Sequence, residues 1–383
     1  MSALVGVTDP EARMRSRDPQ DMVQLLTPEG VRVDHPDFAW DGDAAQLRGM
    51  LRGMLQARRF DAEGTALQRH GELGLWPPLL GQEAAQVGAA AALAGQDFVF
   101  PSYREHAVAL AMGVPVAEML KLWRGTGQGD WDPQTFRFQL YTLVIGSQTL
   151  HATGYAMGLQ LDGMVGNPEP DRNAAVLAFH GDGASSQGDV NEAYVFAASY
   201  NAPVVFFCQN NQWAISEPTD RQTRIPLYQR ARGFGFPGIR VDGNDALAVH
   251  AVTQWAMQRA REGQGPAFIE AFTYRRGAHT TSDDPTKYRL AEEDEHWKGR
   301  DPIERVTTHL RSIDELDDAW LADLDQQLDD FGADVRKACH DLEVRPMEVI
   351  FDHVHAEPTA ELRAQREEYL AWVDSFGPRG EDA

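Results

Sequence analysis

Cysteine is scarce in this sequence. Two of its 383 residues are cysteines, Cys208 and Cys339, and neither belongs to a CxxC pair. So few thiols exclude a disulfide framework and a cysteine-based metal site. We therefore expect both cysteines to be buried and chemically inert.

Long apolar runs are absent as well. No stretch of the sequence approaches the ~20 residues that a membrane-spanning helix needs, so we expect no membrane partner. Residues 1–25 mix acidic and basic side chains and contain no apolar segment. That composition disfavours a secretory signal or a transit peptide, and we expect a cytoplasmic protein.

Basic residues are outnumbered by acidic ones, 35 to 58, which gives a formal net charge of -23. The resulting field repels nucleic acids and anionic membranes, so we expect no nucleic-acid partner. A local cluster of arginines can still hold an anion inside an acidic protein. Hydrophobic residues make up 43% of the chain, which indicates a globular protein rather than a disordered one.

The apolar pattern predicts strands that alternate with helices. Such alternation implies parallel βαβ units, and therefore an α/β fold with a doubly wound, mostly parallel sheet flanked by helices. Buried strands are expected over Ala174–His180, Pro203–Gln209, Ile239–Val241 and Ala267–Tyr274. Helices are expected from Ala44 onward and over Gln82–Ala94, Asp189–Ser199 and Asp245–Arg261.

The two ends of the chain differ from its middle. Residues 1–43 show no sustained periodicity, which is typical of an extended arm. Apolar residues recur at every fourth position from Leu316 to Leu328, between many acidic ones. This pattern predicts a solvated amphipathic helix, and a further helix is expected over Thr359–Phe376. We therefore expect an N-terminal arm over 1–43, an α/β domain over 44–310 and a C-terminal helical extension over 311–383.

The segment His180–Ser216 carries the most informative chemistry. Asp182 follows one predicted strand, between Gly181 and Gly183, and Asn211 follows the next strand. A right-handed crossover makes these strands parallel, so their carboxyl ends meet at the edge where open α/β sheets bind ligands. A carboxylate, an amide oxygen and a main-chain carbonyl are hard ligands that suit Mg²⁺ and leave positions for phosphate oxygens. The glycines allow the backbone to approach those phosphates closely.

A dinucleotide-binding turn is the alternative interpretation of Gly181 and Gly183. The GxGxxG fingerprint needs glycine at its sixth position for close packing of helix against strand. This chain has Ser186 there, which disfavours a nicotinamide cofactor.

The GDG and NN pair resembles the thiamine-diphosphate motif. Over residues 45–375 the sequence resembles the alpha subunit of the dehydrogenase component of two-chain 2-oxo acid dehydrogenase complexes. The resemblance implies thiamine diphosphate and Mg²⁺ as cofactors, with the metal bound by Asp182, Asn211 and the carbonyl of Trp213. It also implies cofactor contacts for Gly183, Ala184 and Gln209.

Two further stretches carry the same resemblance. In PSYREH, the Tyr103–Arg104 pair resembles the family's diphosphate clamp, and an arginine can grip a phosphate through two N–H groups. In LVIGSQTLHATG, the backbone of Ile145 is implied to contact the aminopyrimidine ring. Ser147 and Gln148 match a potassium site of some relatives.

The loop YRRGAHTTSDDPTKYR resembles the family's active-site loop. Its His279 is the implied catalytic residue, in contact with cofactor and reacting substrate, where an imidazole can donate or accept a proton. Thr280 and Leu290 stand where animal relatives carry serines that a kinase modifies. We therefore expect no control by that kinase.

The resemblance implies oxidative decarboxylation of a small 2-oxo acid, with transfer of the acyl group to a lipoyl domain of an acyltransferase component. It also implies a beta subunit that completes each site in an α₂β₂ heterotetramer. The run FFCQNNQWAISEPT, the loop HTTSDD and the tail Glu357–Glu368 resemble branched-chain 2-oxo acid dehydrogenases. The resemblance implies a substrate such as 3-methyl-2-oxobutanoate, and pyruvate is the alternative. A transketolase-like subunit and a non-catalytic scaffold are more remote alternatives.

Overall fold

The structure is a computed structural model that describes residues 22–346 and 348–377. Part of the expected N-terminal arm, residues 1–21, lies outside the described residues. Over 22–43 no helix or long strand forms, but Val23 pairs with Val241 at one edge of the sheet. The beginning of the described chain is therefore attached to the α/β core.

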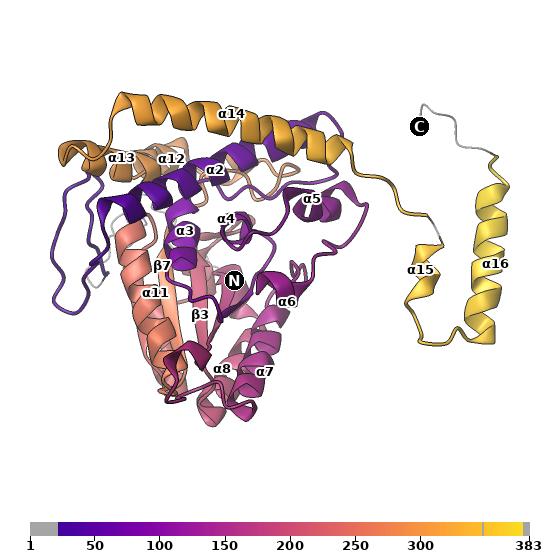
Figure 1. Ribbon diagram of the computed structural model, residues 1–383, viewed down its shortest axis with the longest axis horizontal. Helices are drawn as coiled ribbons and strands as arrows, with labels where there is room; N and C mark the ends of the chain where they lie inside the picture. The colour runs from indigo at the N-terminus through magenta and orange to yellow at the C-terminus, as the bar shows by residue number, and fades with distance from the viewer. Residues whose placement is uncertain (1–21, 347, 378–383) are drawn as a thin grey trace, which may run out of the picture.

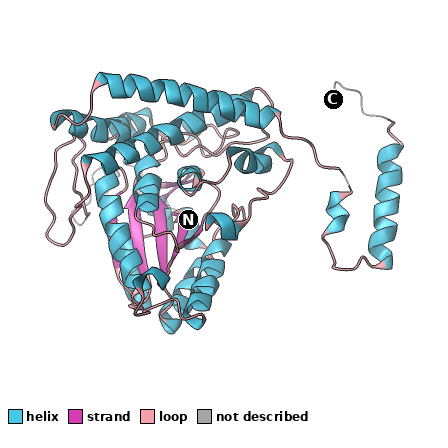
Figure 2. Ribbon diagram, viewed as in Figure 1, coloured by secondary structure: helices cyan, strands magenta, loops and turns pink. Residues whose placement is uncertain are grey.

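A sheet of five parallel strands forms the centre of the protein, with the order β1-β2-β3-β7-β6 (Figures 1 and 2). Strands β1, β2, β3 and β7 are almost completely buried because helices cover both faces, and for this reason they are rich in apolar residues, whereas β6 at the edge is partly exposed. The strand bounds are β1 (Phe98–Phe100), β2 (Val176–Gly181), β3 (Val204–Asn210), β6 (Gly238–Asp242) and β7 (Ala267–Phe272).

Helices lie on the two faces as the predicted doubly wound topology requires. The connections β1–β2 and β2–β3 contain α7 (Ser147–Leu161) and α8 (Gly188–Tyr200), which pack on one face around Phe206. The connection β6–β7 contains α11 (Ala246–Arg261), which packs with α3 (Glu83–Ala91) on the other face. Right-handed crossovers that advance in opposite directions place their helices on opposite faces. The predicted fold class is thereby confirmed.

Two long helices pack against each other on the side of the sheet that α3 and α11 cover. α14 (Asp318–His340) lies along α2 (Ala44–Arg69) (Figure 1). Gly332 allows their close approach, since a Cβ there would lie 2.6 Å from the side chains of Arg59 and Glu63. The predicted amphipathic helix is thus present, but it continues to His340 because Val335 and Cys339 extend its buried stripe.

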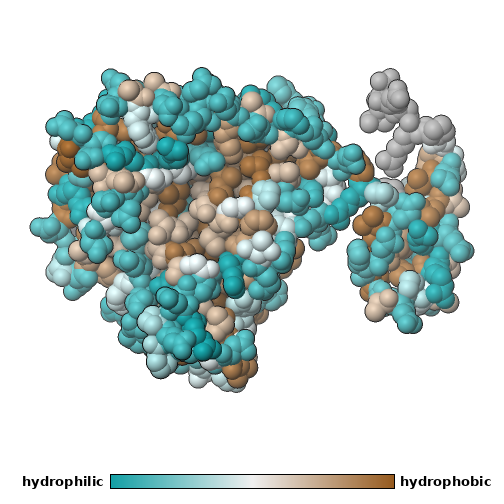
Figure 3. Space-filling view, viewed as in Figure 1, coloured by the Kyte–Doolittle hydropathy of each residue, from teal (hydrophilic) through white to brown (hydrophobic). Residues whose placement is uncertain are grey.

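The last described segment lies apart from this body (Figure 1). It consists of α15 (Val349–Asp352) and α16 (Ala360–Asp374), the second of which is capped by the Thr359 side chain. Apolar side chains on this segment are exposed (Figure 3). They include Ile350, Val354, Trp372 and Phe376.

None of the helices within 22–346 and 348–377 is long and apolar enough to cross a bilayer.

Shorter elements connect the layers of the fold. The remaining helices are α4 (His106–Ala111), α5 (Val116–Arg124), α6 (Pro133–Phe136), α9 (Thr219–Gln222), α10 (Arg230–Phe234), α12 (Ala291–Lys298) and α13 (Pro302–Ser312). Four 3₁₀ turns, η1 (Pro170–Arg172), η2 (Gly183–Ser186), η3 (Leu227–Gln229) and η4 (Pro285–Lys287), and the hairpin β4 (Trp213–Ala214) and β5 (Glu217–Pro218) complete the described elements.

Candidate functional site

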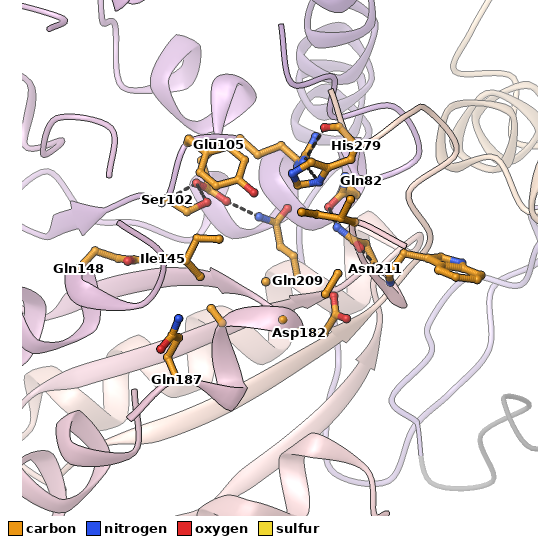
Figure 4. A pocket seen from close by; sticks show the side chains of 18 residues that line it. Gln82, Ser102, Glu105, Ile145, Gln148, Asp182, Gln187, Gln209, Asn211 and His279 are labelled. Carbon is orange, nitrogen blue, oxygen red and sulfur yellow. Dashed lines mark hydrogen bonds between the residues drawn. The ribbon is translucent and has the colours of Figure 1, made fainter. Parts of the chain in front are cut away.

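A pocket of about 200 Å³ lies at the carboxyl edge of the sheet. The segments that follow β1, β2, β3 and β7 all reach it, as expected for an open α/β sheet. All ten of the predicted site residues line this pocket (Figure 4). They are Tyr103, Arg104, Ile145, Asp182, Gly183, Ala184, Gln209, Asn211, Trp213 and His279.

Asp182 follows β2 directly and is almost fully buried. Its Oδ2 accepts hydrogen bonds from Thr219 Oγ1 (3.0 Å) and Gln222 Nε2 (3.1 Å). Burial raises the pKa of the Asp182 carboxyl, because a carboxylate loses solvation in such a place. A bound cation would reverse this effect by favouring the ionised form.

Gly183 allows the turn after Asp182 to lie close to the β4–β5 hairpin. A Cβ at this position would lie 2.7 Å from the Cβ of Ala214, whereas a Cβ on Gly181 would meet nothing within 4 Å. Neither glycine has a positive φ. The sequence predicted that the backbone approaches a phosphate closely at both glycines. The structure requires a close approach at Gly183 but not at Gly181, and the neighbour at Gly183 is the side chain of Ala214.

The two asparagines after β3 point in different directions. Asn210 donates through Nδ2 to the buried Glu270 (2.7 Å), so its side chain belongs to the core. Asn211 lines the pocket and donates through Nδ2 to Gln82 Oε1 (3.1 Å) (Figure 4). Asn211 is therefore the one of the two asparagines whose side chain lines the pocket, and its role as a metal ligand stays a prediction.

The carbonyl of Trp213 is held by Arg275. Arg275 Nη1 donates to this oxygen (2.9 Å), and Nη2 donates to the carbonyl of Ile215 (2.8 Å). A carbonyl oxygen has two lone pairs, so one remains for a metal. Arg275 thus fixes the position of the third predicted metal ligand.

Arg104 and His279 meet on one wall of the pocket. Arg104 is buried, and its Nη2 donates to the Nδ1 (3.2 Å) and carbonyl (2.9 Å) of His279. Its Nη1 donates to the carbonyl of Pro78 (2.6 Å). The ring of Tyr103 lies edge-on to His279, with a centroid distance of 6.2 Å. The predicted diphosphate clamp and the predicted catalytic histidine are therefore neighbours.

His279 is neutral in this setting. Burial and the cations of Arg104 and Arg275 lower the pKa of His279 to about 3. An arginine can only donate, so Nδ1 is the acceptor and the ring proton is on Nε2. The loop is held by Asp283, which accepts from His279 N (2.8 Å) and from Tyr288 OH (2.5 Å).

Several polar residues in the pocket were not predicted from the sequence. Gln86, on α3, lies behind the lining residues and donates to Gln209 Oε1 (3.1 Å), and Gln209 donates to Glu105 Oε1 (2.5 Å). Glu105 also accepts from the N–H and hydroxyl of Ser102, and burial raises its pKa. No local pattern marks Ser102 and Glu105, because they face the pocket only when the segment after β1 packs beside the strand ends. The other lining residues are Gln82, Ser102, Glu105, Gln148, Gly181, Gln187, Ala214 and Ile215, of which Gln148 was predicted for a potassium site.

The segment around Ile145 closes another side of the pocket. Ile145 is 43% exposed and stands just before α7, which begins after Gly146 at a φ of 95°. Gln148 is buried, and its Nε2 donates to the carbonyl of Phe179 (2.9 Å). Ser147 donates to the carbonyl of Val144 (2.9 Å). Occupancy of a potassium site at Ser147 and Gln148 stays a prediction.

The oxygen ligands in the pocket suit a cation that is bound together with an anionic ligand such as a phosphate. Within the described ranges, no group of three or more His, Cys, Asp or Glu side chains gathers at a metal-binding distance. The pocket instead offers the carboxylate of Asp182, the amide oxygen of Asn211 and the carbonyl of Trp213, and the guanidinium of Arg104 also lines it. Mg²⁺ is bound in this way when a ligand phosphate supplies further oxygens.

The chain is similar in sequence to a known protein family and to individual known proteins. Residues 51–347 match the family described as dehydrogenase E1 component. The chain is 43% identical over 371 residues to the 3-methyl-2-oxobutanoate dehydrogenase subunit alpha of Mycobacterium tuberculosis, which covers 96% of this chain and 98% of that relative. It is 39% identical over 294 residues to the pyruvate dehydrogenase E1 component subunit alpha of Staphylococcus epidermidis and of Staphylococcus aureus, which covers 76% of this chain and 77% of each relative.

Proposed function

Since the chain belongs to the dehydrogenase E1 component family, we propose that it is the alpha subunit of an oxidoreductase that decarboxylates a branched-chain 2-oxo acid. The acyl product is passed to a lipoyl domain of an acyltransferase component. The cofactors are thiamine diphosphate and Mg²⁺. The proposal rests on one observation above all, the meeting of Asp182, Asn211, Arg104 and His279 in a single pocket.

Each of these residues has a role that its surroundings support. Asp182, Asn211 and the carbonyl of Trp213 would hold Mg²⁺, and Arg104 would bind diphosphate oxygens. Thiamine diphosphate, when bound, accepts the electron pair that is released as CO₂ leaves. His279 presents Nε2–H to the pocket, where it can donate to an oxygen of the diphosphate or of the substrate. Since Arg104 and Arg275 hold it neutral, it can also take up a proton when an anion is bound.

A beta subunit is required to complete this site. The pocket of about 200 Å³ is smaller than the roughly 300–1,000 Å³ that small-molecule sites usually have. Its two carboxylates, Asp182 and Glu105, are both engaged in hydrogen bonds, so neither is free to act as a base. Exposed apolar residues at its rim, Val144, Ile145 and Ile215, suit contact with another chain. We propose an α₂β₂ heterotetramer with a cofactor at each alpha–beta interface.

Substrate preference is proposed from the relative that aligns over almost the whole chain. Pyruvate is the second candidate because the pyruvate dehydrogenase alpha subunits are nearly as similar over their aligned part. The test is kcat/KM for 3-methyl-2-oxobutanoate and for pyruvate, measured with the reconstituted enzyme and lipoyl domain. We expect the branched-chain acid to be preferred at least about tenfold, which is ~1.4 kcal/mol of transition-state binding. Preference for pyruvate would reject the branched-chain assignment, and failure to acylate the lipoyl domain with either acid would reject the dehydrogenase.

A further inference from the structure

Gln82 lies at the wall of the pocket, although no motif marks it. It stands immediately before α3 and is completely buried, yet its side chain makes no capping hydrogen bond to that helix. Its Oε1 accepts from Asn211 Nδ2 at 3.1 Å. Figure 4 shows the two side chains joined on the pocket side of the sheet edge.

The contact with Asn211 selects one orientation of the asparagine amide. A cation binds the amide oxygen and is repelled by the amide N–H group, so an asparagine ligand must be held against a flip. With Nδ2 directed at Gln82, the Oδ1 of Asn211 faces away from Gln82, toward the backbone N–H of Trp213 (3.3 Å). Residues that orient metal ligands in this way commonly alter metal affinity when they are changed.

The other end of the Gln82 amide has no protein partner. Its Nε2 is buried and makes no hydrogen bond to any described residue. Buried polar groups in native proteins are almost always satisfied, and this donor belongs to a residue that lines a ligand pocket. A ligand oxygen is therefore the expected acceptor. His279 lies near Gln82 (Figure 4), and Arg104, which donates to His279, lines the same pocket. The expected oxygen therefore belongs to an anionic group.

We propose that Gln82 is a positioning residue for the metal and a donor to the diphosphate. Its carbonyl oxygen orients the amide of Asn211 toward Mg²⁺, and its N–H group donates to a diphosphate oxygen. This inference rests on the proposed function, because it assumes that the pocket binds Mg²⁺ and a diphosphate.

Two substitutions at Gln82 test its positioning role and its donor role separately. Gln82→Glu keeps an acceptor for Asn211 but replaces the N–H donor by an oxygen. Gln82→Met has a similar length and removes both groups. The exposed Gln134 of α6, which does not line the pocket, provides a control, Gln134→Met. Thermal unfolding of each reconstituted enzyme checks that the variants fold.

The measurement is calorimetric titration of the reconstituted α₂β₂ enzymes. Thiamine diphosphate is titrated over a series of Mg²⁺ concentrations, and inorganic pyrophosphate is titrated at saturating Mg²⁺. In Gln82→Met we expect the Mg²⁺ concentration for half-maximal binding to rise about 10- to 100-fold. In Gln82→Glu we expect no such rise, but a loss of pyrophosphate affinity of at least about tenfold. Gln134→Met should match the unmodified enzyme.

The outcomes are distinguishable. If the unmodified enzyme binds neither thiamine diphosphate nor pyrophosphate with Mg²⁺, the proposed function itself fails. If it binds them and Gln82→Met leaves the Mg²⁺ requirement unchanged, the positioning role is wrong. If Gln82→Glu binds pyrophosphate as tightly as the unmodified enzyme, the donor role is wrong. Should Gln82→Met not fold, Gln82→Glu still tests both roles, because a rise in its Mg²⁺ requirement would contradict the first.

Discussion

Arg104 Nη2 donates to both the ring Nδ1 and the main-chain carbonyl of His279, at 3.2 and 2.9 Å. Arg104 follows the first strand of the sheet and His279 follows β7, so the contact joins two loops from distant parts of the chain. It fixes the tautomer of the histidine and opposes its protonation. Both effects can be measured.

The first prediction concerns the protonation of His279. Its pKa is lowered to about 3 by burial and by Arg104 and Arg275, whereas in the unfolded chain it is near 6.5. Between these values the unfolded state binds more protons, so the stability that neutral His279 contributes is present above pH 6.5 and is lost as pH falls toward 3. An NMR titration of the cofactor-free chain, assigned with His279→Asn, should show no protonation of this ring between pH 5 and 8. A midpoint near 6.5 would contradict the buried, arginine-paired setting.

The second prediction concerns the metal. Asp182→Asn keeps the shape of the side chain and an acceptor for Thr219 but removes the charge. We expect Mg²⁺-dependent binding of thiamine diphosphate to weaken at least about 100-fold, which is ~2.7 kcal/mol. The unliganded chain should not lose stability, because burial already opposes ionisation of Asp182. Calorimetry and thermal unfolding measure the two effects, with the exposed Asp189→Asn as control. Unchanged cofactor affinity would remove Asp182 from the metal site.

The third prediction compares two glycines of one motif. In Gly183→Ala the new Cβ would lie 2.7 Å from the Cβ of Ala214, whereas in Gly181→Ala it would meet nothing within 4 Å. We expect Gly183→Ala to lower the free energy of unfolding by about 1–3 kcal/mol, as overpacking usually does. Gly181→Ala should leave it unchanged or raise it slightly, since alanine restricts the unfolded chain. Urea unfolding of both variants measures the two changes in free energy of unfolding. Equal changes would show that the contact with Ala214 relaxes freely.

The fourth prediction concerns a buried ion pair outside the site. Asp97 accepts from Arg261 Nε (3.0 Å) and from the backbone of Ala175 (3.0 Å), and so joins the starts of β1 and β2 to the end of α11. Removing one partner of a buried pair leaves an uncompensated charge, which costs about 3–5 kcal/mol. Asp97→Ala should therefore lower the free energy of unfolding by this amount, and the exposed Asp171→Ala should not. A loss below about 1 kcal/mol would mean that water reaches Arg261.

Local sequence patterns determined much of the fold and of the site. Periodicity located β2, β3, β7 and the helices between them because each element buries its own apolar residues. The motifs located Asp182 and Asn211 because each follows a buried strand, and parallel strands end at the same edge. Each of these inferences needs only neighbouring residues.

The tertiary structure decided what depends on partners that are distant in the sequence. β1 has three residues, too few for a periodic signal, and becomes a strand only because β2 pairs with it. Gln82 and Glu105 reach the pocket because α3 and the segment after β1 pack beside the strand ends. The different directions of Asn210 and Asn211 follow from Glu270 on one side and Gln82 on the other. Contacts of this kind depend on how the elements are packed in space, which a local pattern in the sequence does not record.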